Sequence, residues 1–531
     1  FIRGLMMSEK FTISILPEDK KVVAEKGENL LDVLLKSSVQ IDTACGSQGI
    51  CRKCKVRIMG KNGEPETKLA CQIEIIGDME VLVPEVDTKS IQVVNNGFLE
   101  VDGGLDSEMA VAFDIGTTTL KAEVFTIPEG RTIARISSLN PQRVFGHDVM
   151  SRIQAASNPN NAATMTGMIR KSIEGMCKRL LKRTGISYEQ ISRIVIAGNT
   201  VMLHLFFGMD ITGMGKYPYT PVSLSATVED ASPFGFDEFI KTEIIGLPAI
   251  SSYLGGDLVA GILTTGIHEK RETSLLIDIG TNAEIILSYN GSLIATSCAA
   301  GPALEGMNIQ CGMTAGPGAI EEVEIGHEIR LNIIPGYRQP LGLCGSGIID
   351  LIAELIRVGL IDSKGRMLSS DGHVSQEIQS RVRKYKGTHA FYLTEDILFT
   401  QKDVRQVQLA KGAILSGFRA LKEYSGMSPE DVRSVYIAGE FGRNLKLDHI
   451  KRLGFLDDMP NAEYNFLGNS SIAGAKMIGS NPSLLQKAEK IAGKVAAFPL
   501  SSFEGYQRLF VQSLEFPGNP EMGGENAKNQ N

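Results

Sequence analysis

A duplicated turn motif constrains the fold of this chain more than any other feature of its sequence. Residues 110–125 are predicted to form an apolar strand, the turn Asp114-Ile-Gly-Thr-Thr-Thr119 and a second strand. Residues 275–287 repeat this plan around the turn Asp278-Ile-Gly-Thr-Asn282, and each copy is followed at a distance by an apolar strand that ends in Ala-Gly. Matched pairs in the same order indicate an internal duplication. The sequence therefore predicts two similar α/β lobes.

Each of the two turns is suited to bind phosphate. Backbone N–H groups and hydroxyls at a tight glycine-threonine turn can surround an anion, and a carboxylate at the strand end can hold a hydrated Mg2+. Two such turns predict a cleft with a phosphate loop on each wall. The residues expected there are Asp114, Gly116, Thr117, Thr118, Thr119 and Lys121 from the first hairpin, and Asp278, Gly280, Thr281 and Asn282 from the second.

Four of the eight cysteines lie between residues 45 and 71. Cys45, Cys51, Cys54 and Cys71 follow the spacing C-x5-C-x2-C-x16-C, which is close to the plant-type ferredoxin pattern and predicts a 2Fe-2S cluster. A zinc site is one alternative, although zinc more often uses two separate C-x2-C pairs. Disulfides are the other, and they are disfavoured because the remaining cysteines are scattered and no secretory signal is seen.

The residues around the cysteines predict a ferredoxin-like β-grasp domain. Residues 11–16 and 55–58 alternate between apolar and polar as half-buried strands do, and residues 28–35 are predicted to form a helix. The expected organisation is a ferredoxin domain over 8–94, a linker over 95–107, a first lobe over 108–270, a second lobe with the nucleotide site over 271–498 and a tail over 499–531.

Composition argues against several functions. The net charge is -7 and no strongly basic stripe is present, which disfavours nucleic acid as a partner. The longest apolar runs have strand length, which is too short to cross a bilayer. Residues 1–7 lack the apolar core of a signal peptide. We therefore expect a cytoplasmic protein with no nucleic-acid or membrane partner, which could assemble as a homodimer.

The duplicated turns resemble those of the acetate and sugar kinase, heat-shock-70 and actin superfamily, in which two ribonuclease-H-like lobes clamp ATP. This resemblance implies ATP and Mg2+ as ligands and assigns an adenosine contact to Gly439, Glu440, Gly442 and Arg443. The segment 342–347 precedes a predicted helix whose N-terminus could face phosphate or ribose. A purely structural glycine turn is an equal alternative for that segment. Its candidate binding residues are Gly345 and Ser346.

Two carboxylates are candidates for orienting the water that attacks the γ-phosphate. Asp257 follows two glycines at a predicted helix start, where capping of the helix is the favoured role. Glu284 lies in the second strand of the second hairpin and competes with Asp257 for the catalytic role.

A one-electron carrier and an ATP clamp in one chain suggest electron transfer driven by nucleotide, because differential ATP affinity for two conformations can supply free energy to an uphill transfer. The cysteine pattern, the two hairpins and the segments Gly-Leu-Cys-Gly-Ser-Gly-Ile-Ile-Asp and Tyr-Ile-Ala-Gly-Glu-Phe-Gly resemble the ATP-dependent reductive activators of corrinoid proteins. The resemblance implies that an external low-potential donor reduces the cluster. Single electrons then pass to an inactive Co(II) corrinoid protein of a methyltransferase system and restore Co(I).

Three other functions remain as alternatives. An ATP-dependent activator of a dehydratase or reductase would need a 4Fe-4S cluster shared between subunits, for which only Cys298 and Cys311 could be offered. A binding protein that senses redox state and ATP would use the same ligands as a reductase. A small-molecule kinase would have no use for the N-terminal domain.

Overall fold

The computed structural model describes residues 9–16, 20–37, 39, 41, 54–59, 65–83, 91–93, 108–146, 148–337, 339–368, 375–439 and 445–517. The predicted linker 95–107 lies outside these residues. So do five of the predicted site residues, which are Cys45, Cys51, Glu440, Gly442 and Arg443.

The N-terminal unit is a five-stranded mixed sheet with one helix against it. Alternation in the first strand buries Ile13 and Ile15 against Leu31 and Leu34 of the helix, which produces a small core. This arrangement is the β-grasp fold that the sequence predicted. The sheet order is β2-β1-β5-β3-β4, with β1 (Lys10–Leu16), β2 (Lys20–Glu25), α1 (Leu30–Lys36), β3 (Lys55–Met59), β4 (Pro65–Leu69), the short helix η1 (Ala70–Gln72) and β5 (Met79–Leu82).

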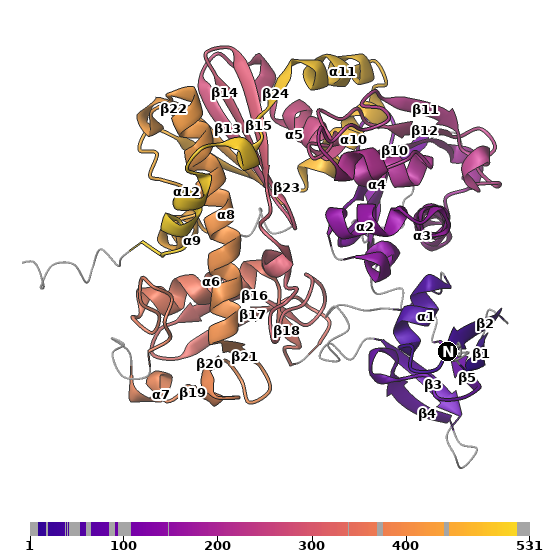
Figure 1. The fold of residues 1–531 in the computed structure, drawn as a ribbon, viewed down its shortest axis with the longest axis horizontal. Coiled ribbons are helices and arrows are strands. Elements are labelled where there is room, and N and C mark those ends of the chain that lie inside the picture. The colour runs from indigo at the N-terminus through magenta and orange to yellow at the C-terminus, as the bar shows by residue number, and fades with distance from the viewer. Residues whose placement is uncertain are drawn as a thin grey trace, which may run out of the picture.

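Two larger sheets share one plan, as Figure 1 shows. In each, an antiparallel three-stranded meander is extended by two parallel strands on the side of its first strand. The first sheet runs β11-β12-β10-β7-β8-β9-β6, with β6 (Ile91–Val93), β7 (Met109–Ile115), β8 (Thr119–Thr126), β9 (Thr132–Leu139), β10 (Ile191–Gly198), β11 (Thr227–Asp230) and β12 (Glu243–Gly246). The second runs β23-β22-β13-β14-β15-β24, with β13 (Thr273–Ile279), β14 (Ala283–Tyr289), β15 (Ser292–Cys298), β22 (Val432–Ala438), β23 (Glu463–Gly468) and β24 (Val495–Ala497). The predicted duplication of a ribonuclease-H-like fold is confirmed.

Helices cover both sheets, and an insertion between β15 and β22 adds two small sheets. The helices are α2 (Val149–Ala156), α3 (Pro159–Thr184), α4 (Thr200–Phe207), α5 (Gly256–Thr265), α6 (Gly345–Arg357), α7 (Gln376–Gln379), α8 (Gln401–Ser425), α9 (Leu447–Leu453), α10 (Ser470–Ser480), α11 (Leu484–Lys494) and α12 (Tyr506–Gln512). The inserted strands are β16 (Ala319–Ile325), β17 (Ile329–Ile333), β18 (Gly342–Leu343), β19 (Val382–Tyr385), β20 (Thr388–Tyr392) and β21 (Leu398–Thr400). Within the described residues, no helix is both long enough and apolar enough to cross a membrane.

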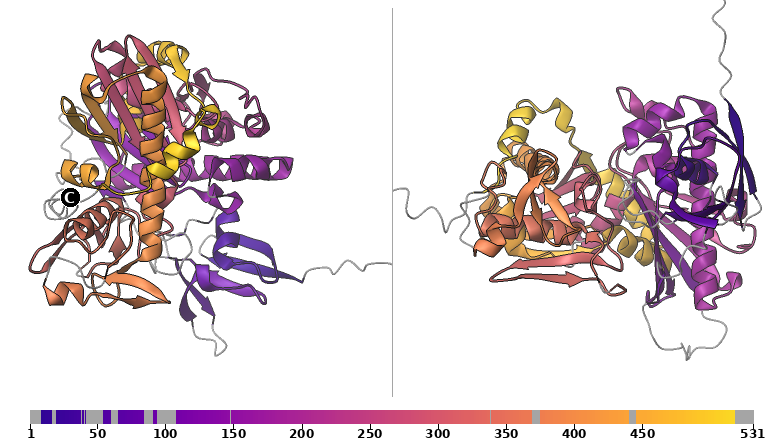
Figure 2. Two further views of the ribbon diagram at one scale, coloured as in Figure 1. Left: turned by 60° about the vertical axis from the view of Figure 1, so that its left-hand side comes forward. Right: turned by 90° about the horizontal axis from the view of Figure 1, so that it is seen from below.

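Two segments pack against units other than the ones to which the expected domain boundaries assign them. β6, which falls inside the expected ferredoxin segment, pairs with β9 of the first lobe because Ile91–Val93 lie antiparallel to residues 134–136. Residues 506–517, expected as a tail, pack along α8, where Gln408 donates to the Leu514 carbonyl (3.0 Å). Figure 2 shows the ferredoxin unit and the two lobes from two further sides.

A single hydrophobic core joins the two lobes. It combines residues of the first sheet, such as Val195, with residues of the second, such as Leu276, and α5 and α10 pack against each other within it. The two helices approach closely because Gly474 of α10 carries no side chain. A Cβ added there would lie 2.5 Å from the Ala260 carbonyl oxygen and 2.6 Å from the Ala260 Cα.

We expect Gly474→Ala to lower the free energy of unfolding by about 1–3 kcal/mol, because the added methyl group must push α5 and α10 apart. Gly167→Ala in α3 is the matched control, since a Cβ there meets nothing within 4 Å. Alanine is the better helix former by up to about 1 kcal/mol, so the control should be neutral or stabilising. Thermal unfolding followed by circular dichroism measures both, and equal effects at the two sites would contradict the close-packing argument.

Candidate functional site

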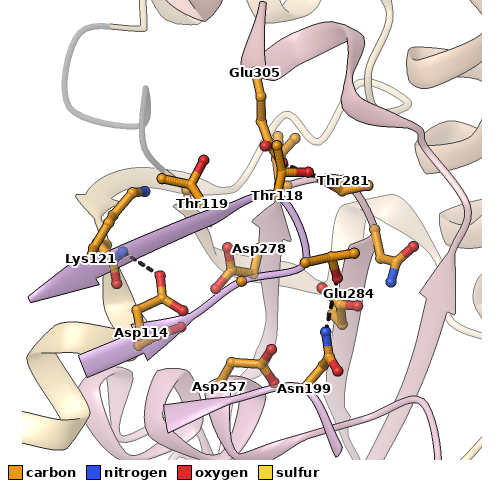
Figure 3. A pocket seen from close by; sticks show the side chains of 18 of the residues that line it. Asp114, Thr118, Thr119, Lys121, Asn199, Asp257, Asp278, Thr281, Glu284 and Glu305 are labelled. Carbon is orange, nitrogen blue, oxygen red and sulfur yellow. Dashed lines mark hydrogen bonds between the residues drawn. The ribbon is translucent and has the colours of Figure 1, made fainter. Parts of the chain in front are cut away.

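The two phosphate hairpins face each other across a cleft that residues of both hairpins line (Figure 3). The β7–β8 turn forms one wall and the β13–β14 turn the other. The cleft brings together thirteen of the predicted residues, which are Asp114, Gly116, Thr117, Thr118, Thr119, Lys121, Asp257, Asp278, Gly280, Thr281, Asn282, Glu284 and Gly439.

Hydroxyl groups connect the two walls. Thr118 Oγ1 and Thr281 Oγ1 lie 2.8 Å apart, and Thr281 Oγ1 also donates to Glu305 Oε1 at 2.7 Å. Because a hydroxyl carries one proton, Thr281 gives its own to Glu305 and accepts that of Thr118. The turns of the two lobes therefore touch directly, and a phosphate chain bound between them would exchange this contact for its own oxygens.

Five carboxylates line the cleft, Glu305 and the four predicted residues Asp114, Asp257, Asp278 and Glu284. Burial, and next the charge of Asp114, raises the pKa of Asp257 to about 7 and that of Asp278 to about 6. Burial, followed by the charges of Asp257 and Asp278, holds the pKa of Glu284 well above its usual range. Like charges that are close and buried disfavour ionisation of one another.

Neutral donors orient these carboxylates. Asn469 Nδ2 donates to Asp114 Oδ2 (2.7 Å), and Ser470 Oγ donates to Asp278 Oδ2 (3.0 Å). Both donors lie at the start of α10, so this helix of the second lobe orients one carboxylate on each wall of the cleft. Ser297 Oγ donates to Glu284 Oε1 (3.0 Å).

Sequence reasoning missed four polar residues of the cleft, Asn199, Glu305, Asn469 and Ser471. Asn199 and Asn469 each cap a helix directly after a strand that ends in glycine, and Asn199 Nδ2 also donates to Thr117 Oγ1 at 3.0 Å. That shared strand-glycine-asparagine pattern is a local signal that could have found both asparagines. Glu305 stands in a short helical turn, and no local pattern distinguishes it.

The donor set suits Mg2+ held through water. Within the described residues, no three side chains of metal-binding type come close enough together to hold one ion. Mg2+ normally keeps several waters and uses one or two carboxylates with substrate phosphates, so a direct cage is not required. Asp114 and Asp278, one on each wall, fit this role because both carboxylates line the cleft and a dication between them would relieve the repulsion between their charges.

Asp257 lies in the first turn of α5, where Gly255 occupies the N-cap position. Its Oδ1 accepts from the Leu258 amide (2.8 Å), so it contacts one helix-terminal N–H and also lines the cleft. The side chain of Asp257 is therefore placed both to cap the helix and to face the cleft, as the two roles considered from the sequence require.

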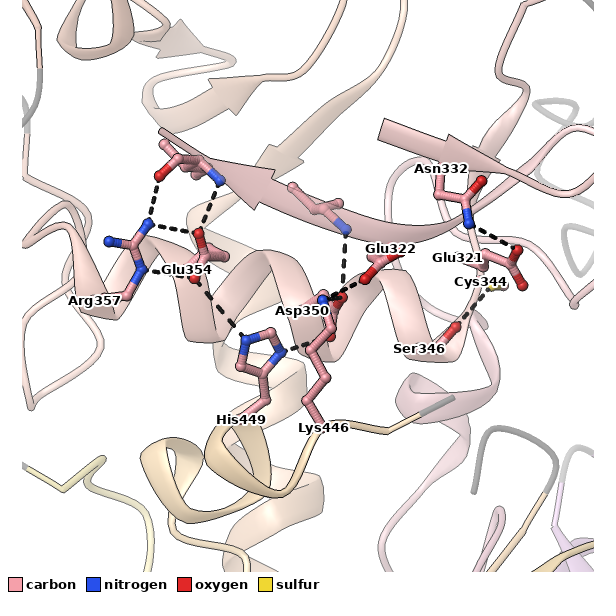
Figure 4. Close-up of polar contacts among 12 residues, drawn as sticks. Glu321, Glu322, Asn332, Cys344, Ser346, Asp350, Glu354, Arg357, Lys446 and His449 are labelled. Carbon is pink, nitrogen blue, oxygen red and sulfur yellow. Dashed lines mark hydrogen bonds and ion pairs between the residues drawn. The ribbon is translucent and has the colours of Figure 1, made fainter. Parts of the chain in front are cut away.

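Gly345 and Ser346 do not join the other predicted residues. They begin α6, but this helix start is buried against β16, where a Cβ on Gly347 would lie 2.2 Å from the Ile320 carbonyl oxygen. Ser346 Oγ lies 3.4 Å from Cys344 Sγ, as Figure 4 shows. Further along α6, Asp350 and Glu354 accept from amides of β16 and contact His449 of α9. Here the glycines serve close packing.

The cysteine pair in the N-terminal unit has the geometry of shared metal ligands. Cys54 Sγ and Cys71 Sγ lie 3.3 Å apart in the buried core. A disulfide would bring them to about 2.05 Å, whereas two thiolates on one tetrahedral metal with bonds of about 2.3 Å lie about 3.8 Å apart. The observed separation excludes a disulfide and is about 0.5 Å shorter than that of two such ligands, so a small shift would place both thiolates on one metal ion. The Ala70 amide donates to the Cys54 carbonyl (2.8 Å) and Asn29 Nδ2 to the Cys71 carbonyl (3.0 Å), which holds both residues in place.

The scattered cysteines are core residues. Cys177, Cys298, Cys311 and Cys344 are free and buried. Burial raises the pKa of the Cys298 and Cys311 thiols, which disfavours the thiolate form that a cluster needs. The alternative with a second cluster on these two residues has no support from their surroundings.

The fold and these two sites define a class of protein, a 2Fe-2S ferredoxin joined to an actin and sugar-kinase-type nucleotide clamp. Three family models match the chain and together span residues 13–523. They are the 2Fe-2S iron-sulfur cluster binding domain (13–75), the RACo middle region (109–270) and the C-terminal domain of RACo, the ASKHA domain (272–523). The chain belongs to the RACo family of reductive activators of corrinoid proteins.

Relatives along most of the chain agree with this assignment. The corrinoid activation enzyme RamQ of Eubacterium limosum is 28% identical, with 88% of this chain and 91% of that protein covered. The reductase of the Co(II) methylated amine-specific corrinoid protein of Methanosarcina barkeri is 25% identical over 76% of each chain. The solved structure of a reductive activator for a corrinoid, iron-sulfur protein covers 96% of this chain and 98% of its own, with a TM-score of 0.72 and 26% identity.

Proposed function

We propose that this protein is an ATP-dependent reductase that activates a corrinoid protein, transferring one electron at a time to inactive Co(II) and restoring Co(I) for methyl transfer. The observation that carries this function is the presence, in one chain, of a thiolate pair suited to one iron and a two-walled phosphate cleft. Relatives that are named for corrinoid activation and reduction support the same conclusion. The cobalt of the partner is the substrate.

In this proposal the four cysteines Cys45, Cys51, Cys54 and Cys71 bind the 2Fe-2S cluster, which supplies one-electron transfer at a potential near -400 mV when it is of the plant type. Cys54 and Cys71 are buried beside an apolar core. Such a shell limits access of water to the cluster and keeps its potential low. An external low-potential donor reloads it after each transfer.

ATP binds between the two hairpins in this proposal. The threonine hydroxyls and turn amides take the phosphates, and Asp114 and Asp278 hold a hydrated Mg2+. Asp257 orients the attacking water. Its pKa of about 7 leaves it partly ionised at neutral pH, so it can accept a proton from that water. Glu284, whose pKa burial and the charges of Asp257 and Asp278 raise well above its usual range, is the alternative for this role.

The remaining assignments extend the same proposal. The chain divides near residues 94, 107, 270 and 498 into a ferredoxin domain, a linker, two lobes and a C-terminal segment. We place the protein in the cytoplasm, where free thiols such as Cys177 persist. A homodimer is the proposed assembly, with the corrinoid protein as a transient partner.

The decisive experiment reduces the cluster-loaded protein, mixes it with a Co(II) corrinoid protein in the presence of Mg-ATP, and follows the absorbance of Co(I) by stopped flow. We expect Co(I) to form with ATP and to form far more slowly without it. An electron-transfer yield that is indifferent to ATP would refute the coupling. Failure to reduce any Co(II) corrinoid protein would leave a sensing role as the better account.

A further inference from the structure

A fully buried arginine lies between the phosphate cleft and the ferredoxin domain. Arg152 of α2 is 0% exposed. It donates through Nη2 to the Thr117 carbonyl, through Nε to the Gly146 carbonyl (3.1 Å) and through Nη1 to Gln142 Oε1 (3.4 Å). These acceptors are neutral and lie in two segments, the phosphate turn and residues 142–146, so the guanidinium joins those two segments.

One of these segments is the turn of the first phosphate hairpin. Thr117 and Thr118 both line the cleft. The Thr117 carbonyl and the Thr118 amide belong to one peptide unit, so a phosphate oxygen that accepts from this amide polarises the carbonyl that Arg152 holds. Hydrogen bonds that share a polarised group strengthen one another. Bound phosphate should therefore tighten the contact between Arg152 and the turn.

The other end of the network is a short helical turn, η3 (Pro141–Phe145). Its cap residue Asn140 accepts from the Gln142 amide (2.9 Å) and donates through Nδ2 to the Gly116 carbonyl (2.8 Å), so η3 is attached to the same hairpin a second time. Arg152 holds η3 through Gln142 and the residue that follows η3, Gly146. The position of η3 is thus determined by the phosphate turn.

η3 is also the surface on which the ferredoxin domain rests. α1 packs against η3, and Val144 of η3 lies against the ferredoxin core that includes Leu34 and Cys71. Figure 1 shows α1 facing the first lobe at this point. A displacement of η3 would therefore loosen the contact with the domain that holds the cluster.

We infer that Arg152 is a positioning residue that couples nucleotide binding to the docking of the ferredoxin domain on η3, an inference that rests on nucleotide binding in the proposed function. Bound nucleotide strengthens the bond to Thr117, holds η3 in place and favours the docked ferredoxin. By linkage, docking strengthens nucleotide binding by the same factor. The position of the cluster then depends on the occupancy of the cleft.

The test uses the full-length protein loaded with its cluster. Hydrogen exchange of the amides of α1 is measured with and without Mg2+ and a non-hydrolysable ATP analogue, and calorimetry measures binding of the analogue to the same samples. We expect the analogue to slow exchange in α1 by about fivefold or more in the unaltered protein, which is the usual lower range for coupled sites.

Arg152→Lys should still bind the analogue but should lose the effect on α1, because lysine cannot hold the three acceptors in a planar fork. Arg170→Lys is the matched control. Arg170 donates to the Phe206 carbonyl (2.7 Å) in the same lobe, away from the phosphate turn, so this variant should respond as the unaltered protein does.

Val144→Asp weakens the docking contact directly. Its result can therefore be interpreted even if the Arg152→Lys variant does not fold. In this variant the amides of α1 should exchange rapidly with or without the analogue. The variant should also bind the analogue more weakly, by the same factor by which the analogue slows exchange in α1 of the unaltered protein. The inference would be overturned if bound analogue left hydrogen exchange in α1 unchanged in the unaltered protein. It would also be overturned if the analogue slowed exchange in α1 of Arg152→Lys as much as in the unaltered protein. Neither result would affect the proposed function. Absence of analogue binding to the unaltered protein would instead refute the proposed function.

Discussion

Replacing Cys71 with serine is expected to abolish the visible absorption of the 2Fe-2S cluster and to reduce formation of Co(I) to the background rate, while ATP binding persists. A serine hydroxyl stays protonated at neutral pH and is a poor ligand for iron, whereas the thiolate is the form that binds. Cys71 and Cys54 are close enough to share one iron, so loss of either leaves that iron open.

Cys311→Ser is the matched control for this experiment. Cys311 is a buried thiol of the second lobe, so the same substitution is made away from the four predicted cluster ligands. The control should retain the cluster spectrum, the iron content and electron transfer. Full iron and labile sulfide in Cys71→Ser would show that Cys71 is not a ligand. Loss of both in Cys311→Ser would place a second centre in the ATP-binding lobes.

Replacing Asp257 with asparagine is expected to lower ATP turnover by about 10²- to 10⁴-fold with little change in nucleotide affinity, which is the usual contribution of a group that handles a proton in the transition state. Glu284→Gln should cost less, because burial and the charges of Asp257 and Asp278 raise the pKa of Glu284 and so disfavour the carboxylate that would accept the proton. Turnover and nucleotide binding are measured separately for both variants. A larger loss of turnover in Glu284→Gln than in Asp257→Asn would show that Glu284, and not Asp257, orients the attacking water.

The pH dependence provides an independent check on Asp257. Its pKa is raised to about 7, so activity should rise with pH through that value as the carboxylate forms. The stability of the nucleotide-free protein should move in the opposite direction. Between pH 4 and 7 the folded state holds a proton that the unfolded state has released, so stability falls as pH rises. Asp257→Asn removes this effect and should raise the melting temperature at neutral pH. A flat activity profile from pH 6 to 8 would contradict the assignment.

Much of the fold follows from local patterns in the sequence. The alternation on each side of Gly116 and Gly280 requires a hairpin, and repetition of the pattern requires two lobes. The cysteine spacing predicts that the four cysteines come together, and of the two that the structure describes, Cys54 and Cys71 lie side by side. These features could be predicted because neighbours along the chain determine them.

The parts that could not be predicted depend on contacts between distant segments. Asn469 reaches Asp114 across 355 positions of the chain, and Thr118 reaches Thr281 across 163. Ser346 shows the converse, since its glycine-rich surroundings resemble a phosphate loop although the helix start packs against β16. A glycine motif specifies how the backbone bends and leaves open which group will lie beside it.

The sequence by itself predicted the two glycine-threonine hairpins, the 2Fe-2S domain and the family to which the chain belongs. Only the tertiary structure decided that Asp114, Asp257, Asp278 and Glu284 share one cleft, where distance and burial set the pKa values of the last three. It likewise decided that Arg152 joins the cleft to the ferredoxin contact. A sequence orders residues along a line, whereas electrostatic and packing energies depend on separation in space.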